Sequence, residues 1–279
     1  AGVRAYYAYP MTPSSSILGY LASVYKETGM LVKQIDDEIS VAQMAIGSMF
    51  MGTRALVGTS GGGFDLMTES VSLAGMTETP FVCVLAQRPG PATGLPTWTS
   101  AADLNLAVFA GHGEFARCVI AASDPESCYL AVQQAFNIAE EFQTVVIVLT
   151  EKQIGESLFQ MRDLPADLPI ERHLVSPEKC EDLVSSDRYQ VTESGVSPRW
   201  LPGMSDATFD ANSDEHLEDG SLTEDALPSL RMYDKRLRKQ AGILAKLPEP
   251  VMYGPEDAAV TLVGWGSVKN AVADVMPTW

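Results

Sequence analysis

The sequence has few cysteines, and none of them lies in a metal-binding pattern. Its four cysteines include no CxxC pair, whereas zinc sites and iron–sulfur clusters need closely spaced thiolates. Cys83 and Cys118 stand inside apolar runs, where a small buried side chain is the ordinary interpretation. A chain of 279 residues can also bury a core without a disulfide framework. We therefore expect no iron–sulfur cluster, no zinc site and no disulfides.

Basic residues are scarce as well. The 19 lysines and arginines face 36 acidic residues, which gives a net charge of −17. Binding to nucleic acid or to an anionic membrane surface requires clustered basic side chains, so we expect neither partner. Asp and Glu concentrate between residues 178 and 225. A solvated surface is the simpler interpretation of this run, and a specific cation site is the alternative.

Long apolar runs are missing too. None approaches the roughly 18 residues of a membrane span, and the opening AGVRAYYAYP lacks the basic and then apolar order of a signal peptide. A cytoplasmic location is therefore expected. The sequence starts without an initiator Met and stops soon after the start of a new α/β pattern. We therefore expect it to be a fragment of a longer polypeptide.

Short apolar runs alternate with longer amphipathic segments over residues 1–160. This alternation predicts an α/β domain with an open, mainly parallel sheet and helices on both faces. Strands are expected at 3–8, 31–35, 55–59, 81–86, 118–122 and 145–149. Helices are expected at 14–28, 37–51, 64–74, 101–111 and 125–141. Ser14 or Ser15 is the expected N-cap of the first helix.

The rest of the chain has a different character. Residues 161–250 are rich in Pro, Ser, Asp and Glu and show no clear period. They predict an extended acidic arm or insertion that ends in a basic helix at about 230–247, with a disordered surface loop as the alternative. At 258–267, AAVTLVGWGS predicts a buried strand, and a helix is expected from residue 268. Residues 251–279 are therefore expected to begin a second, truncated α/β domain.

A proline-rich loop, YPMTPSS, follows the first expected strand. Pro10 and Pro13 each fix φ near −65° and push the preceding residue out of the helical region. The result is a stiff loop that presents Thr12 at the crevice where open parallel sheets bind ligands. Simple capping of the next helix is the alternative role.

An acidic cluster, Asp36-Asp37-Glu38, begins the second expected helix. Capping and compensation of the helix dipole explain Asp36 and Asp37 well. Glu38 also follows a parallel strand at the same edge of the sheet as Thr12. It is therefore a candidate for the same crevice.

Two further loops leave strands at this edge. GTSGGGF at 58–64 exposes backbone amides around Gly61 and Gly62, but it matches neither GxGxxG nor GxxxxGK[ST]. In QRPGPATGLPT, Arg88 ends an apolar strand and needs an anion. A carboxylate-bearing substrate is one candidate. An internal ion pair with Glu38 or Glu69 is the other.

These motifs, in this order, resemble the alpha subunit of 2-oxoacid:ferredoxin oxidoreductases, particularly the 2-oxoglutarate branch. Besides those above, AGHGEF, SGVSPRWLPG, NSDEHLEDGSLTEDA and YGPEDAAVTLVGWGS match, so the likeness covers essentially the whole chain. The resemblance implies a domain that binds the pyrimidine half of thiamine diphosphate, with Mg²⁺ and the diphosphate site on a beta subunit. It also implies an arm that packs against partner subunits and a transketolase-C-terminal-like last segment. Gamma and delta subunits are possible further partners.

The resemblance also implies residue roles. Cofactor contacts fall on Pro10, Thr12, Glu38, Gly61 and Gly62. Glu38 would hydrogen-bond the pyrimidine ring, while Thr12 and Arg88 would contact the 2-oxoacid. The implied reaction is oxidative decarboxylation to acyl-CoA and CO₂ with reduction of ferredoxin, and 2-oxoglutarate is the favoured substrate. Pyruvate, a branched-chain 2-oxoacid, a non-catalytic assembly subunit and, at fold level, an NAD-binding protein are the alternatives. For His112 and Glu114 a structural hydrogen bond is expected.

Overall fold

The computed structural model describes residues 1–161 and 163–276. Its centre is a six-stranded sheet in the order β2-β1-β3-β4-β6-β5, and every pair of neighbouring strands is parallel. The strands are β1 (Ala5–Ala8), β2 (Leu31–Gln34), β3 (Ala55–Thr59), β4 (Phe81–Gln87), β5 (Arg117–Ala121) and β6 (Val145–Glu151). The four inner strands are buried almost throughout, as their unbroken apolar runs require. The predicted open parallel sheet is confirmed.

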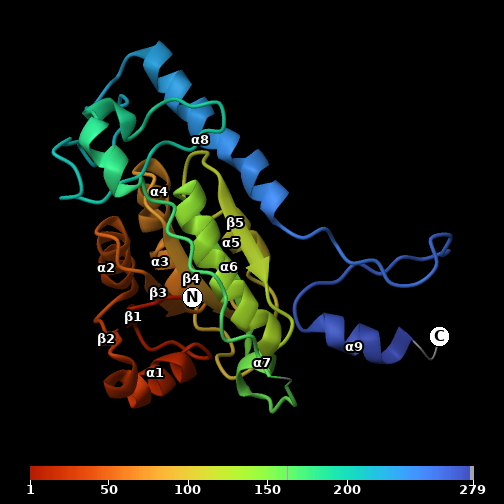
Figure 1. Ribbon diagram of the computed structural model, residues 1–279. Coiled ribbons are helices and arrows are strands. Elements are labelled where there is room, and N and C mark those ends of the chain that lie inside the picture. Colours follow the sequence, from red (N-terminus) through yellow and green to blue (C-terminus); the bar gives the residue numbers. More distant parts are fainter. Residues whose placement is uncertain (162, 277–279) are drawn as a thin grey trace.

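Helices cover both faces of this sheet (Figure 1). They are α1 (Ser15–Thr28), α2 (Glu38–Phe50), α3 (Gly61–Leu66), α4 (Thr68–Met76), α5 (Leu104–Val108), α6 (Pro125–Phe142) and α7 (Lys152–Glu156). The chain moves from β1 to β2 in one direction along the sheet and from β2 to β3 in the other. Because parallel crossovers are right-handed, α1 and α2 lie on opposite faces. By the same rule α6 shares the face of α1, whereas α3 and α4 share that of α2.

Three local predictions differ from the structure. The single helix expected at 64–74 is two helices, α3 and α4, and Gly61–Gly63 form the first turn of α3 instead of preceding it. The helix expected at 101–111 is only α5, because the surrounding Pro, Gly and Thr residues leave the backbone in a loop. Ser14 is the N-cap residue of α1, but its hydroxyl donates to the Met11 carbonyl at 2.7 Å and caps nothing.

The described part of the arm, residue 161 and residues 163–250, packs against the domain. It has two short 3₁₀ turns, η1 (Pro177–Asp182) and η2 (Ser185–Asp187), and one long helix, α8 (Ala226–Lys246). Tyr189, Trp200 and His216 are buried in it, and Phe209 contacts the first two rings edge to face. The basic helix is confirmed, and the disordered-loop alternative is wrong because these rings pack against one another and, through Phe209, against Phe50 of α2.

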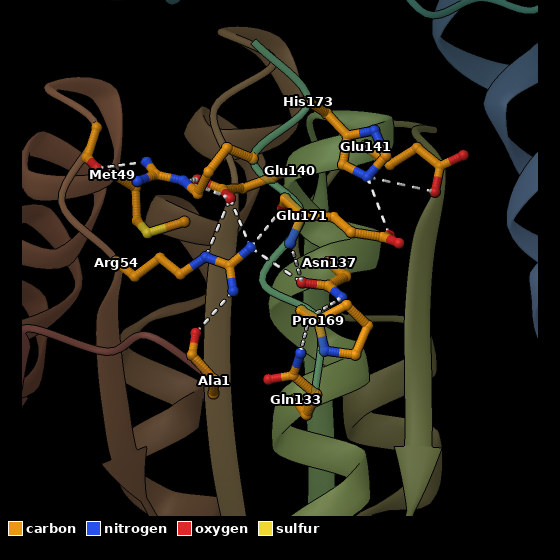
Figure 2. Close-up of polar contacts among 12 residues, drawn as sticks. Ala1, Met49, Arg54, Gln133, Asn137, Glu140, Glu141, Pro169, Glu171 and His173 are labelled. Carbon is orange, nitrogen blue, oxygen red and sulfur yellow. Dashed lines mark hydrogen bonds and ion pairs between the residues drawn. The ribbon is translucent and has the colours of Figure 1, made fainter. Parts of the chain in front are cut away.

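Buried charges join the arm to the domain at two places, the first at Glu140 on α6 (Figure 2). Its carboxylate accepts from Arg54 at 2.8 Å and from Arg172 at 3.0 Å, and Arg199 lies 3.4 Å away. Arg54 also donates to the carbonyl oxygens of Ala1 and Glu171. Removing one partner from such a group leaves an uncompensated buried charge, so these contacts specify how the arm docks.

The second place is Glu78, which follows α4. Lys235 on α8 lies 2.5 Å from its Oε1, and Lys239 on the next turn of α8 contacts Oε2. All three side chains are fully or almost fully buried. Burial opposes the charge on Glu78, but the two ammonium groups outweigh it and hold the pKa of this carboxyl far below its usual range.

Beyond the arm, the predicted buried strand at 258–267 is wrong. Residues 251–264 have no regular secondary structure and are exposed, and they run away from the body of the protein in Figure 1. A strand needs a neighbour to satisfy its backbone groups, and this segment has none among the described residues. The expected helix is present as α9 (Val268–Val275), and Asn270 Nδ2 donates to the Ser123 carbonyl at 2.9 Å. No helix in the described part of the chain is long and apolar enough to cross a membrane.

Candidate active site

Loops from four neighbouring strands meet at the carboxyl edge of the sheet. In their order, β2-β1-β3-β4, the connections from β1 and from β3 run to opposite sides of the sheet, so the topological switch point lies between β1 and β3. Open parallel sheets bind ligands at such a point. The Thr12 loop leaves β1, Glu38 follows β2, Gly61 follows β3 and Arg88 follows β4. The prediction that these motifs share one edge is therefore confirmed.

Glu38 is the first residue of α2 and is almost completely buried, with 4% of its surface exposed. The preceding Asp37 takes the capping role, because its Oδ1 accepts from the Ser40 N–H at 2.8 Å. That hydrogen bond and one from the Ser40 hydroxyl lower the pKa of Asp37. Glu38 is left without a capping duty, and its Oε1 has no hydrogen-bond partner in the part of the chain that the structure describes.

Gly63 makes room for the Glu38 carboxyl. A methyl group at Gly63 would lie 2.6 Å from Glu38 Oε1 and 2.9 Å from its Cγ, and it would also collide with the Thr59 hydroxyl. Thr59 is fully buried at the end of β3 and cannot withdraw. The third glycine of GTSGGGF therefore serves packing, which sequence reasoning missed because it weighed the glycines only as exposed amides.

Arg88 and Thr12 are in direct contact. Arg88 Nη1 donates to the Thr12 carbonyl at 2.7 Å, so the contact uses the backbone of Thr12 and not its hydroxyl. Arg88 is 7% exposed, and its Nε has no partner among residues 1–161 and 163–276. The alternative that Arg88 pairs with Glu38 or Glu69 is wrong, since no ion pair of the described residues includes it.

The other expected site residues are more peripheral. Pro10 is exposed at the start of its loop. Gly62 faces the long loop after β4, because a methyl group there would lie 3.5 Å from the Ala92 carbonyl. Gly61 lies under a carboxylate that sequence reasoning did not single out, Asp103, whose two oxygens would each be 2.9 Å from a methyl group at Gly61. The sequence predicted Asp103 within the helix at 101–111, whereas it directly precedes α5 in the structure.

Several buried polar atoms at this edge lack partners within the described residues. They are Glu38 Oε1, Ser60 Oγ, Arg88 Nε and Asp103 Oδ2. Native proteins leave few such atoms unsatisfied, because each costs about 1–3 kcal/mol. The set contains both donors and acceptors, which suits a ligand that carries a ring nitrogen and a carboxylate. The residues present therefore fit the cofactor and substrate implied by the resemblance.

Two other polar groups lie apart from this edge. His112 donates its backbone N–H to Ser72 Oγ at 2.9 Å, and a structural role for the His112 and Glu114 side chains stays a prediction. On α6, Glu141 meets Glu171 and His173 of the arm, with ligand atoms within 4.8 Å of one another (Figure 2). Lys246 already pairs with Glu141 at 2.9 Å, so ion pairing accounts for this half-exposed group.

Comparisons with known proteins identify the family of this chain. The family model "Pyruvate flavodoxin/ferredoxin oxidoreductase, thiamine diP-bdg" matches residues 1–234. The "2-oxoacid:ferredoxin oxidoreductase 1, subunit alpha" of Sulfurisphaera tokodaii is 35% identical over 99% of this chain and 46% of its own length. The "2-oxoglutarate synthase subunit KorA" of Methanothermobacter thermautotrophicus is 30% identical over 98% of this chain and 72% of its own length.

A solved structure is similar over the same extent. The 2-oxoglutarate:ferredoxin oxidoreductase from Magnetococcus marinus, with 2-oxoglutarate, coenzyme A and succinyl-CoA bound, has a TM-score of 0.89 and 31% identity over 99% of this chain and 49% of that one. The present chain thus spans about half the length of the matched Magnetococcus marinus chain and of the Sulfurisphaera subunit. It belongs to the alpha subunits of the 2-oxoacid:ferredoxin oxidoreductase family and contains the thiamine diphosphate-binding domain of that family.

Proposed function

We propose that this chain binds the pyrimidine half of thiamine diphosphate in a cytoplasmic enzyme that oxidatively decarboxylates a 2-oxoacid. The products are acyl-CoA and CO₂, and ferredoxin takes the electrons. One observation carries the proposal: Glu38 is buried beside Gly63 at the carboxyl edge of the sheet, and its Oε1 has no partner in the described chain. A buried carboxyl with an unused oxygen is suited to share a proton with a ring nitrogen.

Thiamine diphosphate, when bound, supplies the electron sink for cleavage of the carbon–carbon bond next to the keto group. Glu38 would hold the proton shared with the pyrimidine ring. Its burial excludes water, which strengthens a hydrogen bond to the ring. Pro10, Thr12, Gly61 and Gly62 are proposed to line the same half of the site, where glycines let a ring approach the backbone.

Arg88 is proposed to hold the carboxylate of the 2-oxoacid. Its Nη1 is fixed by the Thr12 carbonyl, so the guanidinium is oriented before substrate arrives. Its Nε remains available, and a guanidinium in a buried position gains most from a carboxylate partner. Thr12 would contact the same substrate while it positions Arg88.

A beta subunit is proposed to supply Mg²⁺ and the diphosphate site. The loop after β4 and the end of α5 expose two large apolar side chains: Trp98 is 65% and Phe109 75% exposed. Exposed apolar patches of this kind mark interfaces, so a partner surface is expected there. Gamma and delta subunits are proposed to carry the electron path, and coenzyme A would take the acyl group.

The favoured substrate is 2-oxoglutarate. The names of KorA and of the Magnetococcus marinus enzyme support it. Arg88, however, contacts the carboxylate that all 2-oxoacids share, so pyruvate and branched-chain 2-oxoacids are the second candidates. A subunit that only assembles partners is the candidate outside catalysis.

The test uses the complete complex purified with its own partner subunits. Turnover is measured with coenzyme A and ferredoxin on 2-oxoglutarate, pyruvate and 2-oxoisovalerate, with and without added thiamine diphosphate. We expect thiamine diphosphate-dependent turnover with the highest kcat/KM for 2-oxoglutarate. A higher kcat/KM for pyruvate or 2-oxoisovalerate would assign that 2-oxoacid as the substrate instead. If none of the three supports turnover that depends on thiamine diphosphate, only the assembly role is left.

A further inference from the structure

The candidate site contains a hydroxyl group whose role is unassigned, that of Ser60. This residue joins β3 to α3, and none of its surface is exposed. Its Oγ has no hydrogen-bond partner in the described part of the chain. A hydroxyl group can both donate and accept, and burying one without a partner is costly. The Ser60 hydroxyl therefore needs an explanation.

Helix capping does not explain this hydroxyl. Ser60 is the N-cap residue of α3, and its backbone is extended, with φ −126° and ψ 176°. The N-cap residues of α2 and α6, Asp37 and Asp124, are extended as well, and each accepts from the N–H three residues on, at 2.8 and 2.7 Å. Serine caps helices as well as aspartate does, yet the Ser60 side chain makes no capping bond. Its hydroxyl is directed elsewhere.

The alternation of side chains along β3 gives that direction. Thr59, the last residue of β3, faces Glu38, because a methyl group at Gly63 would collide with both side chains. Successive side chains of an extended chain point to opposite faces of the sheet. Ser60 follows Thr59 in an extended conformation, so it faces away from Glu38.

The face opposite Glu38 carries the proline-rich loop. Leu56 lies four positions before Ser60 and therefore faces the same way. It lines a cavity together with Pro13 of that loop and Ala86 of β4. The register of β3 with β4, continued one step past its last pair, places Ser60 beside Ala86. The Ser60 side chain therefore lies next to the end of β4, on the side of the proline-rich loop.

Arg88 reaches the same side. It comes two positions after Ala86, and its Nη1 donates to the Thr12 carbonyl at 2.7 Å. Its Nε is a second buried polar group without a partner among the described residues. Ser60 and Arg88 thus bring two unused donors to one side of the site from adjacent strands. A carboxylate has two oxygens and accepts from two such donors at once.

We propose that Ser60 is a substrate-binding residue whose hydroxyl donates a hydrogen bond to the carboxylate of the 2-oxoacid held by Arg88. This inference rests on the proposed function. It divides the site into two sides: Ser60 and Arg88 bind the substrate anion, and Glu38 binds the cofactor from the opposite face. A hydroxyl group is neutral, so it adds a donor without adding a charge that the buried site would have to compensate.

The test compares Ser60→Ala with a matched control, Ser70→Ala, in the complete complex. Ser70 on α4 is equally buried, but its Oγ accepts from Gln43 Nε2 at 3.0 Å and so has a structural partner. Three quantities are measured for each complex. They are KM for the 2-oxoacid of highest kcat/KM, the affinity for thiamine diphosphate, and the midpoint of unfolding in urea.

Ser60→Ala should raise KM for the 2-oxoacid about 10-fold, the equivalent of one hydrogen bond to a charged group. The affinity for thiamine diphosphate should not change, and the unfolding midpoint should not fall, because the lost hydroxyl has no partner in the described chain. Ser70→Ala should do the reverse, with an unchanged KM and a lower midpoint.

Three results in Ser60→Ala would each overturn the inference. An unchanged KM would show that the hydroxyl does not bind the substrate. A weaker affinity for thiamine diphosphate would assign it to the cofactor, and a lower midpoint would assign it to the fold. If the unchanged complex shows no thiamine diphosphate-dependent turnover, the proposed function fails first, and that result is distinct from all three.

Discussion

Replacing Gly63 by Ala tests whether the first turn of α3 is shaped around Glu38. The new methyl group would stand 2.6 Å from Glu38 Oε1 and 2.9 Å from Glu38 Cγ. Both distances are too short for atoms that are not bonded. Thr59 and Glu38 are both buried, so neither can turn into solvent. The carboxyl group must therefore shift within a packed site.

The magnitude follows from two opposing effects. Ala is favoured over Gly in a helix by about 0.5–1 kcal/mol, while overpacking a buried site costs about 1–3 kcal/mol. Gly63→Ala should therefore lower the free energy of unfolding by up to about 2.5 kcal/mol. A displacement of Glu38 by about 1 Å should also lower turnover on the order of 100-fold.

Gly47→Ala is the matched control. Gly47 lies in α2, the helix that carries Glu38, but apart from its own helix backbone and chain neighbours no described atom lies within 4 Å of the place a methyl group would take. In this variant the free energy of unfolding should rise by about 0.5–1 kcal/mol, and turnover should be unchanged. Urea unfolding of the chain and steady-state turnover of the complex measure both effects. If Gly63→Ala is as stable and active as Gly47→Ala, the packing argument for Glu38 is wrong.

Two further predictions concern buried charges. Arg88→Met should raise KM for the 2-oxoacid by about 10- to 100-fold with a smaller change in kcat, because a charge-assisted hydrogen bond is worth about 1.5–3 kcal/mol. An unchanged KM in steady-state assays would refute the proposed role of Arg88. Glu78→Gln should lower the free energy of unfolding in urea by about 3–5 kcal/mol, because Lys235 and Lys239 stay buried without a counter-charge. Glu141→Gln removes the more exposed pair between Glu141 on α6 and Lys246 on α8, and it should lower the free energy of unfolding by less than about 1 kcal/mol. Since folding lowers the pKa of Glu78, its contribution is present above the ordinary value of 4.5 and is lost as the pH falls below it. Stability should therefore fall less between pH 7 and pH 3 in Glu78→Gln than in the unchanged chain, and equal falls contradict this.

The sheet was largely predictable from the sequence. The strand at 55–59 was predicted with its observed ends, and the other strands differ by a few residues. Buried parallel strands are continuous apolar runs, which single them out. Because their carboxyl ends share an edge, the meeting of Thr12 and Arg88 also followed from the sequence.

The attachment of the arm could not be predicted. Lys235 and Lys239 are four residues apart on a basic helix, a pattern that normally indicates a solvated face. Their partner Glu78 is 157 positions from Lys235, and no local period reports a pairing at that separation. The same holds for Glu140 and its three arginines, whose burial depends on the fold as a whole.

Within the site, the errors have physical causes. The alternative ion pair of Arg88 with Glu38 or Glu69 is absent among the described residues, and Arg88 Nη1 instead donates to the Thr12 carbonyl. Asp103 escaped notice because the helix expected at 101–111 places it in a first turn, where an acidic residue is explained by the helix dipole. The strand expected at 258–267 has the right apolar residues but lacks a neighbouring strand in the described chain.

The most direct test of the account is Glu38→Gln in the complete complex, with Asp37→Asn as the control. Gln has nearly the same shape but cannot share a proton as a carboxyl group does, so thiamine diphosphate-dependent turnover should fall at least about 100-fold. Asn caps helices as well as Asp, and Asp37→Asn should therefore keep turnover and stability. Near-normal turnover in Glu38→Gln would contradict the claim that Glu38 is the cofactor's proton partner.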